Sequence, residues 1–184
     1  MPLKPLEASF GIGWLNFDAW SETYVGVFRL VYEILPDDPA DQKAKDGALC
    51  QLALVGSNHL VEVTIGKLLK PFVGRAKGLS KKTYDRLGYK YAMATVAEQV
   101  TSKKLDLSEE PFLSSERLRE RRNATVHKQS AVANVNMARS ALFTGVEATK
   151  ALYQHFDVGF PYSKILNQYP MRPATMFSKV WCPG

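Results

Sequence analysis

Cysteine, histidine and long apolar runs are all scarce in this chain of 184 residues. Its two cysteines, Cys50 and Cys182, are too few for a zinc cluster, and in a cytosolic protein we expect both to be reduced. No run of about 18 apolar residues is present, so the sequence predicts no membrane span. The N-terminal residues Pro2, Pro5 and Glu7 are unlike a secretory signal, and we therefore expect a cytoplasmic protein.

The three histidines, His59, His127 and His155, follow no metal-ligand pattern. A di-iron helical bundle would carry Glu-x-x-His on two helices, and no glutamate of this chain has a histidine three residues later. The zinc-protease pattern, the glycine-rich phosphate loop and the Gly-x-Ser-x-Gly nucleophile elbow are also missing. The sequence therefore predicts neither a bound metal nor a cofactor.

The overall amino-acid composition is that of a globular protein. Hydrophobic residues make up 46% of the chain and charged residues 23%, which argues against intrinsic disorder and against a fibrous protein. The length fits one domain. Lysine and arginine number 24 against 18 acidic residues, and the resulting net charge of +6 favours attraction to polyanions without establishing nucleic-acid binding.

Apolar residues recur at three- and four-residue steps along most of the chain, which predicts an all-α fold, a bundle of four main helices. Asp18 is expected to cap the first helix, Asp38 the second and Ser80 the third. The predicted helices are 18–35, 39–70, 80–102, a short charged helix at 116–122, and a last long helix that ends near residue 156. Three parts follow from this pattern: an irregular N-terminal arm at 1–17, the bundle at 18–156, and a proline- and aromatic-rich tail at 157–184 that packs on the bundle.

The densest basic stretch is residues 117–128, with the sequence RLRERRNATVHK. An arginine cluster of this kind is most often a solvated helix face, in which Glu116 and Glu120 would pair with neighbouring arginines. This cluster, however, contains Arg122 and Asn123 followed by three residues and then His127. That pattern resembles the R-N-x-x-x-H motif of the HEPN-domain family.

The resemblance implies a helical bundle that carries the motif at the start of a late helix. It implies a metal-independent endoribonuclease, and a toxin or phage-defence effector in particular. In that family two chains pack with their motifs facing, so the active site would be shared by a homodimer acting on RNA. An antitoxin or regulatory protein is a further possible partner, although Gln129 stands where antitoxin-modified members carry tyrosine. The resemblance extends to Glu62 in an earlier helix, near His59.

The residue types suit RNA cleavage by attack of the 2′-hydroxyl on the adjacent phosphate. His127 would act in proton transfer, because the pKa of histidine allows acid or base chemistry near neutrality. Arg122 would stabilise the phosphorane with its permanent charge, and Asn123 would orient the other two groups by hydrogen bonding.

Helical spacing adds one candidate and one difficulty. Arg119, Asn123 and His127 recur at four-residue steps and share one helix face, so Arg119 is a candidate for auxiliary phosphate contact. Arg122 and His127 lie about 140° apart on a regular helix, so Arg122 must reach around, lie in a distorted turn or serve the partner chain. Arg121 and Lys128 are the further expected RNA contacts.

Two alternatives stay open. The chain could be a non-catalytic HEPN-like module that binds RNA or a protein partner, or a plain helical adaptor outside that family. For His59 and Glu62 a buried polar pair or a dimer contact is the simpler interpretation, and His155 most simply complements a helix dipole.

Overall fold

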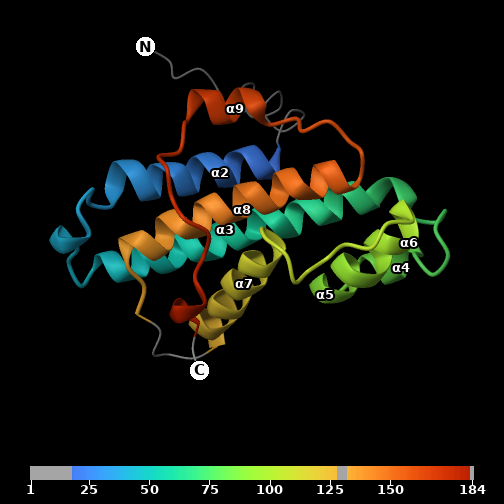
Figure 1. Ribbon diagram of the computed structural model, residues 1–184, viewed down its shortest axis with the longest axis horizontal. Coiled ribbons are helices and arrows are strands. Elements are labelled where there is room, and N and C mark those ends of the chain that lie inside the picture. Colours follow the sequence, from blue (N-terminus) through green and yellow to red (C-terminus); the bar gives the residue numbers. More distant parts are fainter. Residues whose placement is uncertain (1–17, 128–131, 183–184) are drawn as a thin grey trace, which may run out of the picture.

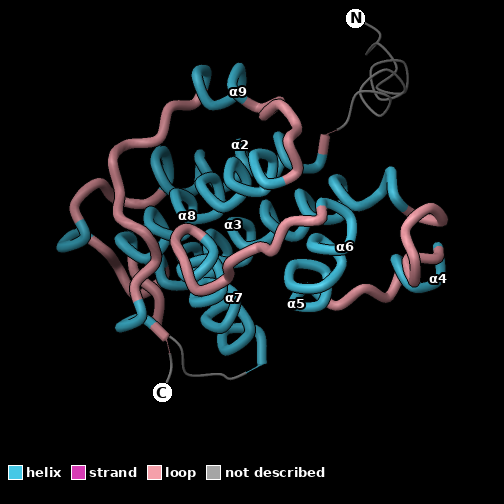
Figure 2. Tube along the Cα trace, turned by 45° about the vertical axis from the view of Figure 1, so that its right-hand side comes forward, coloured by secondary structure: helices cyan, strands magenta, loops and turns pink. Residues whose placement is uncertain are grey.

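The computed structural model describes residues 18–127 and 132–182. Every regular element within these two stretches is helical and none is a strand, which confirms the all-α prediction (Figure 2). The N-terminal arm expected at 1–17 lies outside the described residues. In the described part Asp18 caps the first helix as predicted, since its Oδ1 accepts a hydrogen bond of 3.3 Å from the backbone of Trp20.

Helix α3, Asp46–Leu69, is the centre of the molecule. It packs along α8, Val135–His155, and against α2, Ala19–Arg29, so that these three helices run side by side along the long axis (Figure 1). Its buried residues occur on every side, as expected of a helix enclosed by others. By length and composition, Asp46–Phe72 is the one helical stretch of the described chain that could cross a membrane, and half of its most apolar 18 residues are buried inside the molecule.

Two glycines allow the central helices to approach closely. A Cβ atom on Gly145 of α8 would lie 2.5 Å from the backbone carbonyl oxygen of Ser57 in α3. A Cβ atom on Gly56 of α3 would lie 2.5 Å from Cγ2 of Val27 in α2. Larger residues at these positions would force the helices apart, because packed cores have little spare volume.

The prediction of an unbroken helix over 39–70 is wrong at its start. Asp38 caps only a 3-10 turn, Pro39–Asp41, and α3 begins at Asp46. Gln42 is extended there, and its side-chain amide donates to the carbonyl of Ala133 at 3.1 Å while its Oε1 accepts from the backbone of Val135 at 2.9 Å. The turn is therefore fixed to the beginning of α8 by tertiary contacts that the periodicity does not show.

The predicted helix over 80–102 is broken into short pieces. Ser80 does cap a helix, through a 3.1 Å hydrogen bond from the backbone of Thr83, but this helix, α4, ends after one turn. Extended backbone at Gly88 separates it from the next turn, and a left-handed Ser102 ends the segment. The pieces are α4 at Lys81–Tyr84, α5 at Tyr89–Tyr91, a π-turn at Ala92–Val96 and α6 at Ala97–Thr101.

The short helix predicted at 116–122 is wrong in length. Helix α7 spans Phe112–His127 and begins directly after Pro111, where a proline sacrifices no intrahelical hydrogen bond. The last helix begins at Val135. The residues Arg122, Asn123 and His127 therefore lie in the last turns of α7, whereas the HEPN resemblance implies the start of a late helix.

The described part of the tail, residues 157–182, lies across the outside of α2 and α8 (Figure 1). The ring of Tyr162 stacks on Trp20 with 4.0 Å between their centroids, and Phe177 is completely buried. The backbone of Phe177 donates a 2.8 Å hydrogen bond to Oγ1 of Thr144 in α8. Its helical elements are α9 at Ser163–Gln168 and a 3-10 turn at Lys179–Trp181.

Candidate functional site on helix α7

Helix α7 packs its first turns on α3 and α8 and then leaves them at a steep angle, as Figures 1 and 2 both show. Arg122 and Asn123 lie toward its outer end, where Nη1 of Arg122 donates a 3.0 Å hydrogen bond to Oδ1 of Asn123. The Nε atom of Arg122 is buried without a hydrogen-bond partner among the described residues. The backbone of His127 ends the helix, but its side chain, and all of Lys128, lie outside the described residues.

Arg119 is held within the molecule. Its guanidinium forms a two-point ion pair with Glu116, at 3.2 and 3.0 Å, and lies 5.6 Å from the centre of the Tyr89 ring. Burial lowers the pKa of Arg119, but the hydrogen bonds and charge of Glu116 outweigh burial, so the pKa is raised overall. Arg119 therefore joins α7 to α5, and Glu116 would compete with a phosphate for this guanidinium.

Arg121 does not fit the prediction of an RNA contact. The side chain is buried, and its Nη2 donates a hydrogen bond to the backbone carbonyl of Val132. Burial also lowers the pKa of this guanidinium. Arg121 thus fastens α7 to the residues that lead into α8, and the arginine predicted to face RNA has a structural position instead.

Glu62 and His59 lie on α3 and are partly exposed, with side chains 31% and 50% accessible, so a buried pair is excluded. Oε1 of Glu62 accepts a 2.8 Å hydrogen bond from Asn58, and its Oε2 is 3.7 Å from Nδ1 of His59. Glu62 also lines a pocket of about 450 Å³ between α3 and the segment 84–92. The other lining residues are Ile65, Gly66, Leu69, Tyr84, Asp85, Leu87, Tyr89 and Ala92.

The electrostatic surroundings of Tyr89 show which residues the fold brings together at this pocket. Burial raises the pKa of Tyr89 to about 12; a hydrogen bond with Ser115 and the charge of Arg119 lower it, and Glu116 and Glu62 raise it. Tyr89 therefore lines the pocket together with Glu62 and also contacts Ser115 and Arg119 of α7, while Arg122 and Asn123 pair with each other about a turn further along that helix.

The described residues contain no group of three or more histidine, cysteine or acidic side chains placed to hold a metal ion. Both Cys50 and Cys182 are free thiols. Cys182 lies against α7, where its Sγ is 3.5 Å from the carbonyl oxygen of Arg117. His155 ends α8, and its Nε2 is 3.1 Å from Oγ1 of Thr101. Burial lowers the pKa of this imidazole.

A second basic region, residues 70–91, is the feature that reasoning from motifs missed. We call it the basic end. It contains seven of the 24 lysines and arginines but only one of the 18 acidic residues, so the rest of the chain, with 17 of each, is neutral. All seven are exposed: Lys70, Arg75, Lys77, Lys81, Lys82, Arg86 and Lys90. A count of charge along the sequence would have found it, whereas a search for motifs does not.

Comparison of the chain with protein-family models, with curated proteins and with solved structures found no match. The resemblance to the HEPN family therefore depends on the motif itself and on the helical composition of the fold.

Proposed function

We propose that this chain is a metal-independent endoribonuclease of the HEPN type, acting in the cytoplasm as a toxin or phage-defence effector. Residues 18–156 would be its HEPN-like bundle of four main helices, and residues 157–184 a tail on that bundle. The observation that carries the proposal is the 3.0 Å hydrogen bond between Arg122 and Asn123, about one turn before His127 in the same helix. It holds an arginine and an amide together about one helical turn before a histidine, the residue type suited to proton transfer near neutrality.

The proposed reaction uses these side chains from two copies of the chain, together with RNA. His127 accepts the proton of a 2′-hydroxyl, whose oxygen attacks the adjacent phosphorus. Arg122 stabilises the charge on the phosphorane, and the bond from phosphorus to the 5′-oxygen breaks as that oxygen takes a proton from a second, protonated histidine. The products are a 2′,3′-cyclic phosphate and a free 5′-hydroxyl.

A second copy of the chain would complete this site. One histidine cannot hold a proton for the leaving oxygen while it accepts one from the 2′-hydroxyl, and a facing motif supplies the second histidine and a second arginine. The outward direction of α7 supports such an arrangement, because its outer end extends beyond α2 and α3 (Figures 1 and 2). A regulatory protein or antitoxin would bind the same dimer.

Cleavage of RNA in EDTA tests the proposal. The purified full chain should produce cyclic phosphate ends from total or transfer RNA, and His127→Ala should lower the rate by a factor of about 100 or more. His155→Ala is the matched control, because it removes a histidine from a different helix end and should leave cleavage intact. An inactive wild-type chain, or equal activity in the His127 variant, would overturn the proposal.

Arg122→Ala tests the residue that carries the argument. Loss of its charge should slow cleavage by a factor of about 100, in keeping with the loss of one group that stabilises a developing oxyanion. Arg29→Ala, on the exposed side of α2, is the control and should not alter the rate. If both variants cleave at the wild-type rate, the pair with Asn123 has no catalytic role.

A non-catalytic helical module that binds RNA or a protein is the second candidate. The internal contacts of Arg119 and Arg121 favour the protein-binding form of this candidate, because they remove two of the expected phosphate contacts from the surface of α7. This candidate predicts no cleavage in EDTA and full tolerance of His127→Ala, so the same experiment separates the two.

A further inference from the structure

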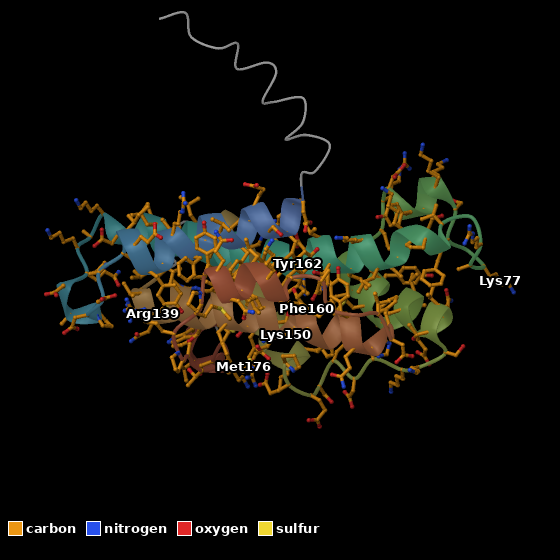
Figure 3. All side chains as sticks on the ribbon, turned by 90° about the horizontal axis from the view of Figure 1, so that it is seen from above. Lys77, Arg139, Lys150, Phe160, Tyr162 and Met176 are labelled. Atoms are coloured by element: carbon orange, nitrogen blue, oxygen red, sulfur yellow. The ribbon has the colours of Figure 1, made fainter. Side chains whose placement is uncertain are left out.

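The basic end concentrates free positive charge at one extremity of the molecule, where Figure 3 shows Lys77. It consists of the turn after α3, the following loop, and helices α4 and α5. Of its seven exposed cations, Lys90 alone has an ion pair within the described residues, at 3.6 Å from Glu116. Because like charges held close together repel, such a surface is stabilised by an anionic partner.

An open pocket in the basic end has the size and chemistry of a nucleotide site. Its volume is about 370 Å³, and its lining combines the cations Lys82 and Arg86 with the ring of Tyr91, the backbone of Gly88 and the neighbouring Thr83 and Leu87. Tyr91 is 52% exposed. A base can stack on an exposed ring of this kind while cations beside it contact the adjoining phosphates.

The exposed side chains favour nucleic acid over a lipid surface. A peripheral membrane site combines cations with apolar side chains that enter the bilayer. Among the described large apolar residues that are well exposed, Tyr91 is the one in this region. Leu79 is buried, and Phe72 and Val73 are half-buried and packed against the core. The partner suited to these residues is therefore a chain of phosphates that carries planar bases.

We propose that residues 70–91 bind single-stranded nucleic acid, with Lys82 and Arg86 on phosphates and Tyr91 stacked on an unpaired base. This surface adjoins α7 at Tyr89 and Lys90 but uses cations other than the arginines of that helix, and binding to it does not depend on cleavage there. If α7 does cleave RNA, the basic end is where the strand is held, and the two activities can be lost independently.

Binding is measured by fluorescence anisotropy with the full-length chain. The probes are a labelled single-stranded RNA of about 20 nucleotides, a single-stranded DNA of the same sequence, and its duplex. We expect both single strands to bind more tightly than the duplex, because stacking on Tyr91 needs an unpaired base. Tighter binding to the duplex, or to vesicles containing phosphatidylserine, would overturn the proposal.

Matched variants locate the site. Lys82→Ala with Arg86→Ala should weaken binding by about tenfold or more, and the slope of log K against log salt should fall by about 1.4 for two lost phosphate contacts. The control, Lys43→Ala with Lys45→Ala, removes the same charge from exposed lysines at the other end of α3, about 36 Å away and beyond the screening length. If both double variants lose the same affinity, the effect depends only on net charge, and the proposed site is refuted.

Variants of Tyr91 distinguish the contribution of base stacking to binding from that of charge. Tyr91→Ala should weaken binding by about fivefold or more with an unchanged salt slope, and Tyr91→Phe should restore it. An alanine variant that binds like the wild type would overturn the stacking role. His127→Ala should bind RNA normally whatever its effect on cleavage, so failure of the proposed nuclease and failure of this surface remain distinguishable.

Discussion

Helix α7 and the basic end are both rich in cations, but they use them differently. The arginines of α7 each contact another protein group: Arg117 contacts Glu110, Arg119 contacts Glu116, Arg121 contacts the Val132 carbonyl, and Arg122 contacts Asn123. The cations of the basic end extend into solvent, and within the described chain six of the seven have no ion pair.

The difference follows from where each segment lies in the fold. Helix α7 is packed between α3, α8 and the last turn of the tail, so a side chain on most of its faces meets protein. The basic end consists of turns and one-turn helices at an extremity, where side chains meet water. Arginine suits the packed helix α7, because its planar guanidinium makes several hydrogen bonds at once. Lysine suits the exposed basic end, because its ammonium group is strongly hydrated. Density of positive charge in a sequence is thus a poor measure of accessible charge.

The largest expected effect on stability is at Arg121. Arg121→Ala should lower the free energy of unfolding by about 2 kcal/mol, because it removes a buried, charged hydrogen-bond donor and leaves the Val132 carbonyl without this partner. Urea denaturation followed by circular dichroism measures it. Arg86→Ala, in the basic end, is the control and should stay within about 0.5 kcal/mol of the wild type. Equal losses at the two positions would abolish the distinction between the regions.

A smaller loss is expected at Arg119. Arg119→Ala should cost about 1 kcal/mol, the sum of a half-buried ion pair with Glu116 and a cation–π contact with Tyr89. Arg119→Lys should recover only part of this, since lysine cannot form the two-point contact. The exposed Lys77 provides the comparison, and Lys77→Ala should be neutral in the same urea titration. A neutral Arg119→Ala would mean that this arginine is available to a ligand after all.

Much of the helical content could be predicted from the sequence, because packing periodicity is a local property. The cap at Asp18 and the run of apolar residues that became α8 are examples. The breaks could not be predicted in the same way. Gln42 ends a turn through contacts with Ala133 and Val135, more than 90 residues away in the chain.

The candidate site also depends on contacts between residues that are distant in the chain, which local sequence patterns cannot predict. The motif at Arg122, Asn123 and His127 is visible in the sequence, and adjacency alone brings the first two together. That Arg121 would turn into the molecule depends on where the backbone at Val132 lies, which no local pattern specifies. The excess of cations in the basic end can also be counted in the sequence, but the segment carries no motif. It became a candidate binding surface only because the structure shows that these side chains are exposed.

A pH titration sharpens the comparison at Tyr89, a residue of the basic end that contacts α7. Burial raises the pKa of Tyr89 in the folded chain to about 12, above the value near 10 in the unfolded chain. The neutral ring therefore stabilises the fold fully below about pH 10, and this contribution is lost as the pH rises toward 12. Tyr89→Phe should lose less stability than the wild type between pH 10 and pH 12, by up to about 1 kcal/mol after solvent screening. Parallel curves for the two proteins would show that Tyr89 is not shielded by α7.

The smallest effect is expected from removing charge at the basic end, and its sign is opposite to that at α7. Lys77→Gln with Lys81→Gln should raise the free energy of unfolding by a few tenths of a kcal/mol, about 0.3, because two mutually repelling exposed charges are lost. The gain should vanish at about 1 M NaCl, where the screening length is near 3 Å, while the loss at Arg121 should persist because its contact is buried. Unfolding curves at low and high salt measure both. A salt-independent loss in the lysine variant would mean that these side chains make structural contacts, as the arginines of α7 do, and the two regions would then be alike.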